Sequence, residues 1–88
     1  MIKTKVTIKN KLGMHARPAT MLVKAASKYR SDFRIIKDDM EINGKSIMGV
    51  MTLAAEQGSE LEIIADGVDE EYLIKEITKL FEQKFNEE

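Results

Sequence analysis

The segment that decides the fold runs from residue 2 to residue 26 and has the sequence IKTKVTIKNKLGMHARPATMLVKAA. Its first part alternates apolar or threonine side chains with lysines, a period of two that is typical of a strand burying one face. Its second part places apolar residues at positions 19, 22, 23 and 26, the spacing of an amphipathic helix with Pro18 in the first turn. We therefore expect a strand, a loop and a helix, with His15 at the helix start.

The middle of the chain contains shorter patterns. Phe33 to Lys37 and Met40 to Asn43 are expected to be strands of a hairpin, because Asp38 and Asp39 between them tolerate turn geometry. A short helix is expected from residue 47 to residue 53, with Ser46 as its N-cap. Leu61, Ile63 and Ala65 alternate with Glu60 and Glu62, which predicts a fourth strand ending at Asp66-Gly67.

The last segment has the strongest helical pattern and should form the longest helix. Its apolar stripe consists of Leu73, Ile74, Ile77, Leu80 and Phe81. Asp69 fits the N-cap, and Val68 with Leu73 has the spacing of a hydrophobic staple. The acidic end, Asn86-Glu87-Glu88, is expected to be frayed. The whole of residues 1–88 is expected to form one two-layer α+β domain with helices on one sheet face.

Composition argues against several classes of site. The chain has no cysteine and a single histidine, so we expect no disulfide, no metal centre and no cofactor. The N-terminal residues lack the apolar run of a signal peptide, and no stretch approaches the ~20 apolar residues of a membrane span. We expect a cytoplasmic protein that does not insert into membranes.

Charge is distributed unevenly along the chain. Met1 to Ser31 contain eight Lys or Arg and no acidic residue, whereas the rest holds six basic and all fifteen acidic side chains. This asymmetry fits either an acidic partner or an unevenly charged solvated surface. An RNA-binding domain is disfavoured, because the five aromatic residues form no cluster on any expected strand. No nucleic-acid partner is expected.

The motif around His15 has two interpretations. A lone histidine next to Arg17 and Pro18 is compatible with an ordinary exposed loop. At a helix start, however, unpaired backbone N–H groups and the helix dipole favour an anion beside the imidazole, which is a competent nucleophile toward phosphorus. Arg17 can present a forked guanidinium to phosphate, and Pro18 pre-sets the helix entry.

The segment after Ser46 also has two interpretations. Ile47, Met48 and Met51 cannot all face inward from so short a helix, so an exposed apolar docking surface is expected. The alternative is core packing with one exposed methionine. Ser46 itself is expected to cap the helix, and a phosphate there would sit at the favourable end of its dipole.

Two segments carry a family resemblance. LGMHARPA, residues 12–19, resembles the phosphorylation-site signature of the HPr phosphocarrier family, and KSIMGVM, residues 45–51, resembles its regulatory-serine segment. Both occur in the family's order in a chain of the family's length. The resemblance implies a four-stranded antiparallel sheet, covered on one face by three helices as an open-faced sandwich. A monomer is expected, because a carrier must dock transiently with its partners. It also implies a phosphocarrier that is not itself an enzyme.

The resemblance implies roles for individual residues. His15 would accept a phosphoryl group from enzyme I and pass it to sugar-specific enzyme IIA components, with Arg17 as its electrostatic partner and Ala16 and Pro18 supporting the phosphate. Ser46 would be the target of an HPr kinase/phosphorylase, and its phosphorylated form would bind a catabolite-repression regulator. Two alternatives stay open: a carrier of another phosphorelay, and a non-catalytic regulator on the same fold.

Overall fold

The computed structural model describes residues 1–87 and contains the seven expected helices and strands in the expected order, followed by a 3-10 turn. The elements are β1 (Ile2–Thr7), α1 (Ala16–Ser27), β2 (Asp32–Lys37), β3 (Met40–Asn43), α2 (Ile47–Thr52), β4 (Glu60–Asp66), α3 (Glu70–Glu82) and η1 (Lys84–Asn86). The longest helix is α3, as its apolar stripe predicts.

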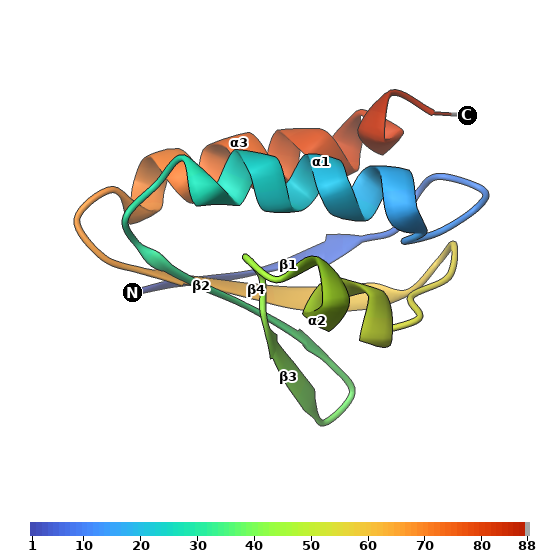
Figure 1. Ribbon diagram of the computed structural model, residues 1–88, viewed down its shortest axis with the longest axis horizontal. Coiled ribbons are helices and arrows are strands. Elements are labelled where there is room, and N and C mark those ends of the chain that lie inside the picture. The colour runs from blue at the N-terminus through green and yellow to red at the C-terminus, as the bar shows by residue number, and fades with distance from the viewer. Residues whose placement is uncertain (88) are drawn as a thin grey trace.

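The four strands form one antiparallel sheet in the order β1-β4-β2-β3. The last strand in sequence, β4, lies between β1 and β2, so that Val6 pairs with Leu61 and Phe33 pairs with Ala65. Helices α1 and α3 run side by side along one face of the sheet, and α2 packs against α1 and β3 (Figure 1). This is the expected α+β open-faced sandwich.

The core lies between the sheet and the helices. It is built from the inward side chains of the strands, such as Phe33 and Ile63, and from the apolar stripes of α1 and α3, including Leu22 and Ile77. Burial of such side chains is the main stabilising contribution in a domain of this size. The opposite face of the sheet carries charged residues, for example Lys5, which forms an exposed ion pair with Glu60. One face of the sheet is therefore solvated.

The start of α3 differs from the sequence prediction. Asp69 occupies the N-cap position, but its side chain caps no helical N–H. It accepts instead from the backbone N–H groups of Arg30 and Ser31, both at 2.9 Å, and from the Ser31 hydroxyl. The staple is also absent within residues 1–87, since Val68 is 89% exposed. The chain packs closely on Ser31 just before the helix, where a Cβ at Gly67 would lie 2.6 Å from Ser31 Cα. The donors of Ser31 therefore lie within reach of the Asp69 carboxylate.

Candidate functional site

The loop between β1 and α1 is braced against the segment that precedes β4. The Met14 N–H donates to the Ala55 carbonyl at 2.8 Å, and the Ile8 N–H donates to Ser59 O at 2.9 Å. Gly13 has φ of +71°, and a Cβ at this position would lie 2.5 Å from Ala55 O. Only glycine meets both requirements without strain. The loop conformation is therefore tightly specified just before His15.

Asn10 is a buried polar residue inside this loop. Its side chain is fully buried, and Nδ2 donates to the Gly13 carbonyl oxygen at 2.8 Å. The same nitrogen donates to Glu87 Oε1 at 3.0 Å. The sequence does not predict a role for Asn10, because a polar residue in a polar loop carries no periodic signal. Its complete burial is visible only in the folded molecule.

His15 is the N-cap residue of α1, with an extended backbone and a side chain that caps no helical N–H. The ring is 36% exposed. Its Nε2 lies 2.8 Å from Glu87 Oε2 and 3.0 Å from Glu87 Oε1. One ring nitrogen is therefore engaged by a carboxylate while the histidine stays accessible at the helix start.

Arg17 lies beside the same carboxylate. Its Nη1 donates to Glu87 Oε2 at 3.1 Å and to the Phe85 carbonyl at 3.2 Å, and its side chain is half exposed. Ala16 is the exposed first residue of α1, and Pro18 is buried in the first turn. The structure thus brings His15 and Arg17 to one anionic group that belongs to the protein itself.

The C-terminal segment corrects the expectation of a frayed end. Lys84, Phe85 and Asn86 have φ values of 56°, 53° and 60°, a left-handed run that turns the chain back toward His15. Phe85 is fully buried and packs edge-on against Phe81, with ring centroids 5.0 Å apart. This anchor places the Glu87 side chain, 13% exposed, at His15. Figure 1 shows the C-terminal end at the same end of the molecule as the loop leading into α1.

The frayed end was a plausible prediction because acidic chain ends seldom pack. One residue in the sequence indicates a packed end: Phe85 lies four residues after Phe81 and continues the apolar stripe of α3. Glu88 belongs to the same expectation and lies outside the described residues.

The electrostatics of this cluster determine its chemistry. Burial raises the pKa of Glu87, but hydrogen bonds from His15, Asn10 and Arg17 outweigh it, so that the pKa is lowered below its ordinary value. The carboxylate is therefore ionised at neutral pH and can only accept hydrogen bonds. Nε2 of His15 must then carry a hydrogen, so in the neutral tautomer of the ring the lone pair is on Nδ1. That nitrogen can act as a nucleophile.

Ser46 forms the predicted N-cap of α2, accepting from the Gly49 N–H at 3.1 Å. Within residues 1–87, no hydrogen bond links Ser46 to the residues around His15. The next apolar side chains are exposed, with Ile47 at 43%, Met48 at 75% and Met51 at 38%, so the core-packing alternative is wrong. Leu12, in the loop before α1, is also 75% exposed.

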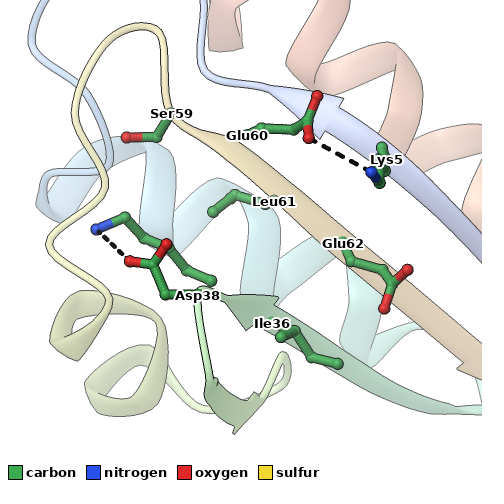
Figure 2. Close-up of a pocket in the computed structure, with 8 residues that line it drawn as sticks. Lys5, Ile36, Asp38, Ser59, Glu60, Leu61 and Glu62 are labelled. Carbon is green, nitrogen blue, oxygen red and sulfur yellow. Dashed lines mark ion pairs between the residues drawn. The ribbon is translucent and has the colours of Figure 1, made fainter.

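An open hollow of about 470 Å³ lies elsewhere, lined by residues from β1, β2 and β4 (Figure 2). Two ion pairs lie at this hollow, one between Lys5 and Glu60 and one between Lys37 and Asp38. None of the residues around His15 lines it. The described part of the chain, residues 1–87, has no group of His, Cys, Asp and Glu arranged to hold a metal ion. In the same range, every helix is too short or too polar to cross a membrane.

Comparison with known proteins shows which family the chain belongs to. The family model described as "PTS HPr component phosphorylation site" matches residues 2–83. The chain belongs to the HPr family. It is 46% identical to the phosphocarrier protein HPr of Treponema pallidum over the full length of both chains. It is 43% identical to that of Xylella fastidiosa strain Temecula1, covering 100% of this chain and 99% of the relative.

The fold agrees with a solved HPr structure. The crystal structure of HPr-C-His from Thermoanaerobacter tengcongensis superimposes with a TM-score of 0.96 at 46% identity, covering 100% of this chain and 99% of that one. The HPr resemblance inferred from residues 12–19 and 45–51 is therefore confirmed, as is the fold it implied. This HPr family member is a phosphocarrier of the phosphotransferase system and not an enzyme.

Proposed function

We propose that this HPr family member carries its phosphoryl group on His15, accepting it from enzyme I and delivering it to sugar-specific enzyme IIA components during sugar transport. The observation that carries the proposal is the placement of His15. Its ring is accessible at the N-terminus of α1, next to Arg17, with one nitrogen engaged by Glu87. Helix N–H groups and a guanidinium are the groups that stabilise a phosphoryl anion.

In the proposed transfer, the Nδ1 lone pair attacks phosphorus and forms the N–P bond. The bond between phosphorus and the donor breaks, and its electron pair leaves with the donor. Arg17 and the free N–H groups at the start of α1, beginning at Ala16, compensate the charge on the phosphoryl oxygens. Pro18 has no N–H to offer and fixes the path of the first turn.

Docking is proposed to use the exposed apolar side chains of Ile47, Met48 and Met51. These flexible side chains are exposed, and methionines adapt to partners of different shape. The basic side chains of residues 1–31 suit an acidic partner and accelerate encounter. A carrier that meets several partners in turn is expected to work as a monomer in the cytoplasm.

Regulation is proposed to act at Ser46, through phosphorylation by an HPr kinase/phosphorylase and recognition by a catabolite-repression regulator. The serine oxygen lies at the start of α2, directly before Ile47 and Met48. A phosphate there adds nearly two negative charges beside the docking surface without unfolding the helix.

The test is incubation with phosphoenolpyruvate and enzyme I, followed by intact-mass analysis and peptide mapping. The expected result is the gain of one acid-labile phosphoryl group on the peptide that contains His15. A gain located on another residue, or no gain at all, would contradict the proposal.

A further inference from the structure

We propose that Glu87 is a positioning residue for phosphoryl transfer, which holds the Nε2–H of His15 so that Nδ1 presents its lone pair to phosphorus. The inference rests on the proposed role of His15. It concerns a residue outside the family match, which ends at residue 83. Its basis is the hydrogen-bond network that converges on one carboxylate.

The carboxylate is held by three donor side chains from the β1–α1 loop and the first turn of α1. Oε1 accepts from Asn10 Nδ2 and His15 Nε2, both at 3.0 Å. Oε2 accepts from His15 Nε2 at 2.8 Å and from Arg17 Nη1 at 3.1 Å. All of these partners are hydrogen-bond donors, so they hold the carboxylate in one position and favour its ionised form. The imidazole that faces it is fixed as well.

Asn10 supplies the rigid side of this arrangement. Its amide is fully buried and is already committed to the Gly13 carbonyl. Turning the amide over would point its oxygen at two acceptors, Gly13 O and Glu87 Oε1, so only one orientation is favourable. The loop that carries His15 and the carboxylate that orients it are therefore linked through one buried side chain.

The backbone of the C-terminal segment is consistent with a specific role. Three successive residues without glycine, from Lys84 to Asn86, have positive φ. Such a run persists only when the surrounding structure enforces it, and it is found preferentially at functional sites. Here the burial of Phe85 and the contact of Arg17 with its carbonyl oxygen enforce the turn. The turn delivers Glu87 to His15.

The Glu87 carboxylate acts both when His15 accepts the phosphoryl group and when it passes the group on. When Nδ1 forms the bond to phosphorus, Nε2 keeps its proton, and the ring becomes cationic because both nitrogens are then substituted. Glu87 neutralises this charge as it develops, as a buried carboxylate does for a catalytic imidazolium. In the onward step the N–P bond breaks, the electron pair returns to Nδ1, and the neutral ring is restored with its proton still on Nε2.

The experiment compares Glu87→Gln with Glu82→Gln in the full chain. Glu82 is an exposed residue at the end of α3, so its variant removes the same charge without touching the network. The first measurement is the ¹⁵N–¹H long-range NMR pattern of the His15 ring at a pH where the ring is neutral. In wild type and Glu82→Gln we expect a protonated Nε2 and an unprotonated Nδ1. In Glu87→Gln we expect a mixture of the two tautomers.

The second measurement is the rate of phosphoryl transfer from enzyme I as a function of carrier concentration. For Glu87→Gln we expect the maximal rate to fall about tenfold, the loss typical of one charge-assisted hydrogen bond, with an unchanged half-saturating concentration. For Glu82→Gln we expect neither parameter to change. Full maximal rate with a wild-type ring pattern in Glu87→Gln would overturn the proposal, and so would a change in half-saturation alone.

The two proposals fail separately. If wild-type protein accepted no phosphoryl group on His15, the proposed function would fall, whereas the ring pattern of the unphosphorylated protein would still report whether Glu87 selects the tautomer. If His15 were phosphorylated but Glu87→Gln left both measurements unchanged, only the role of Glu87 would fall.

Discussion

At the scale of single residues, the site depends on a few side chains whose chemistry is complementary. Glu87 supplies the negative charge, His15 and Arg17 donate to it from the start of α1, and Asn10 donates to it from the buried side of the loop. His15 and Arg17 are partly exposed, so their removal should alter function more than folding, whereas Asn10 is fully buried and also holds the loop. The glycine before the histidine differs, because its contribution is made through the backbone.

His15→Ala should abolish phosphoryl acceptance while leaving the fold intact. The side chain is 36% exposed and makes few packing contacts, so we expect a stability loss of about 1 kcal/mol or less. Intact-mass analysis after incubation with phosphoenolpyruvate and enzyme I, together with a urea unfolding curve, checks both parts. Acid-labile phosphorylation retained in this variant would show that another residue is the acceptor.

Gly13→Ala should destabilise the protein by about 2 kcal/mol or more, because positive φ and a steric clash act together. The added Cβ would lie 2.5 Å from Ala55 O. Gly58→Ala is the matched control, since Gly58 also has positive φ but nothing lies within 4 Å of the added Cβ. Urea unfolding should show the larger loss for Gly13→Ala. Equal losses would mean that contact with Ala55 is relieved without cost.

At the scale of secondary-structure elements, α2 combines a folding role with a proposed regulatory one. Ser46 closes its N-terminus by accepting from Gly49, and the six-residue helix exposes apolar side chains directly after the cap. Helix α2 also contacts α1, the helix that begins directly after His15. Stability and docking can therefore be separated by the choice of substitution.

Ser46→Asp should leave the domain folded but weaken transfer from enzyme I at subsaturating carrier concentration. Aspartate can still cap the helix and suits its dipole, so stability should change by less than ~1 kcal/mol. The added negative charge lies beside Ile47 and Met48, where it opposes docking of an acidic partner. Ser46→Ala is the control, expected to be slightly less stable with normal transfer. Equal transfer by the two variants would contradict regulation by charge at this site.

At the scale of the whole molecule, contacts between distant segments hold the helices against the sheet. Asp69, before α3, accepts hydrogen bonds from Arg30 and Ser31, which lie in the connection between α1 and β2. At the other end, Phe85 packs on Phe81, and Glu87 reaches the β1–α1 loop. These links join the two ends of the helical layer to the loops of the sheet.

The Asp69 link predicts a specific loss of stability in acid. Hydrogen bonds from the Ser31 hydroxyl and from backbone N–H groups lower the pKa of Asp69 from 3.8 to about 2. Because the pKa in the folded state is depressed, the stabilisation is fully present above pH ~4 and is lost as the pH falls toward ~2. Asp69→Asn should be less stable than wild type at pH 7, and the two should converge near pH 2 in urea unfolding. A constant difference across this range would exclude the linkage.

The sequence by itself determined the elements and much of the proposed site. Strand and helix periods are local, so β1, α1 and α3 follow from residues a few positions apart, as does the Ser46 cap. The placement of His15 at a helix start follows from the same pattern. Two motifs of eight and seven residues, 12–19 and 45–51, also indicated the family that the comparisons confirm.

Only the tertiary structure decided which distant residues meet. The position of β4 between β1 and β2 depends on pairing between strands far apart in the chain, which no local period specifies. The same holds for Glu87, which reaches His15 across 72 positions, and for Asp69, whose side chain binds Ser31 instead of capping its own helix. A polar side chain takes whichever donors the fold brings nearest, and those donors are created by packing rather than by neighbouring sequence.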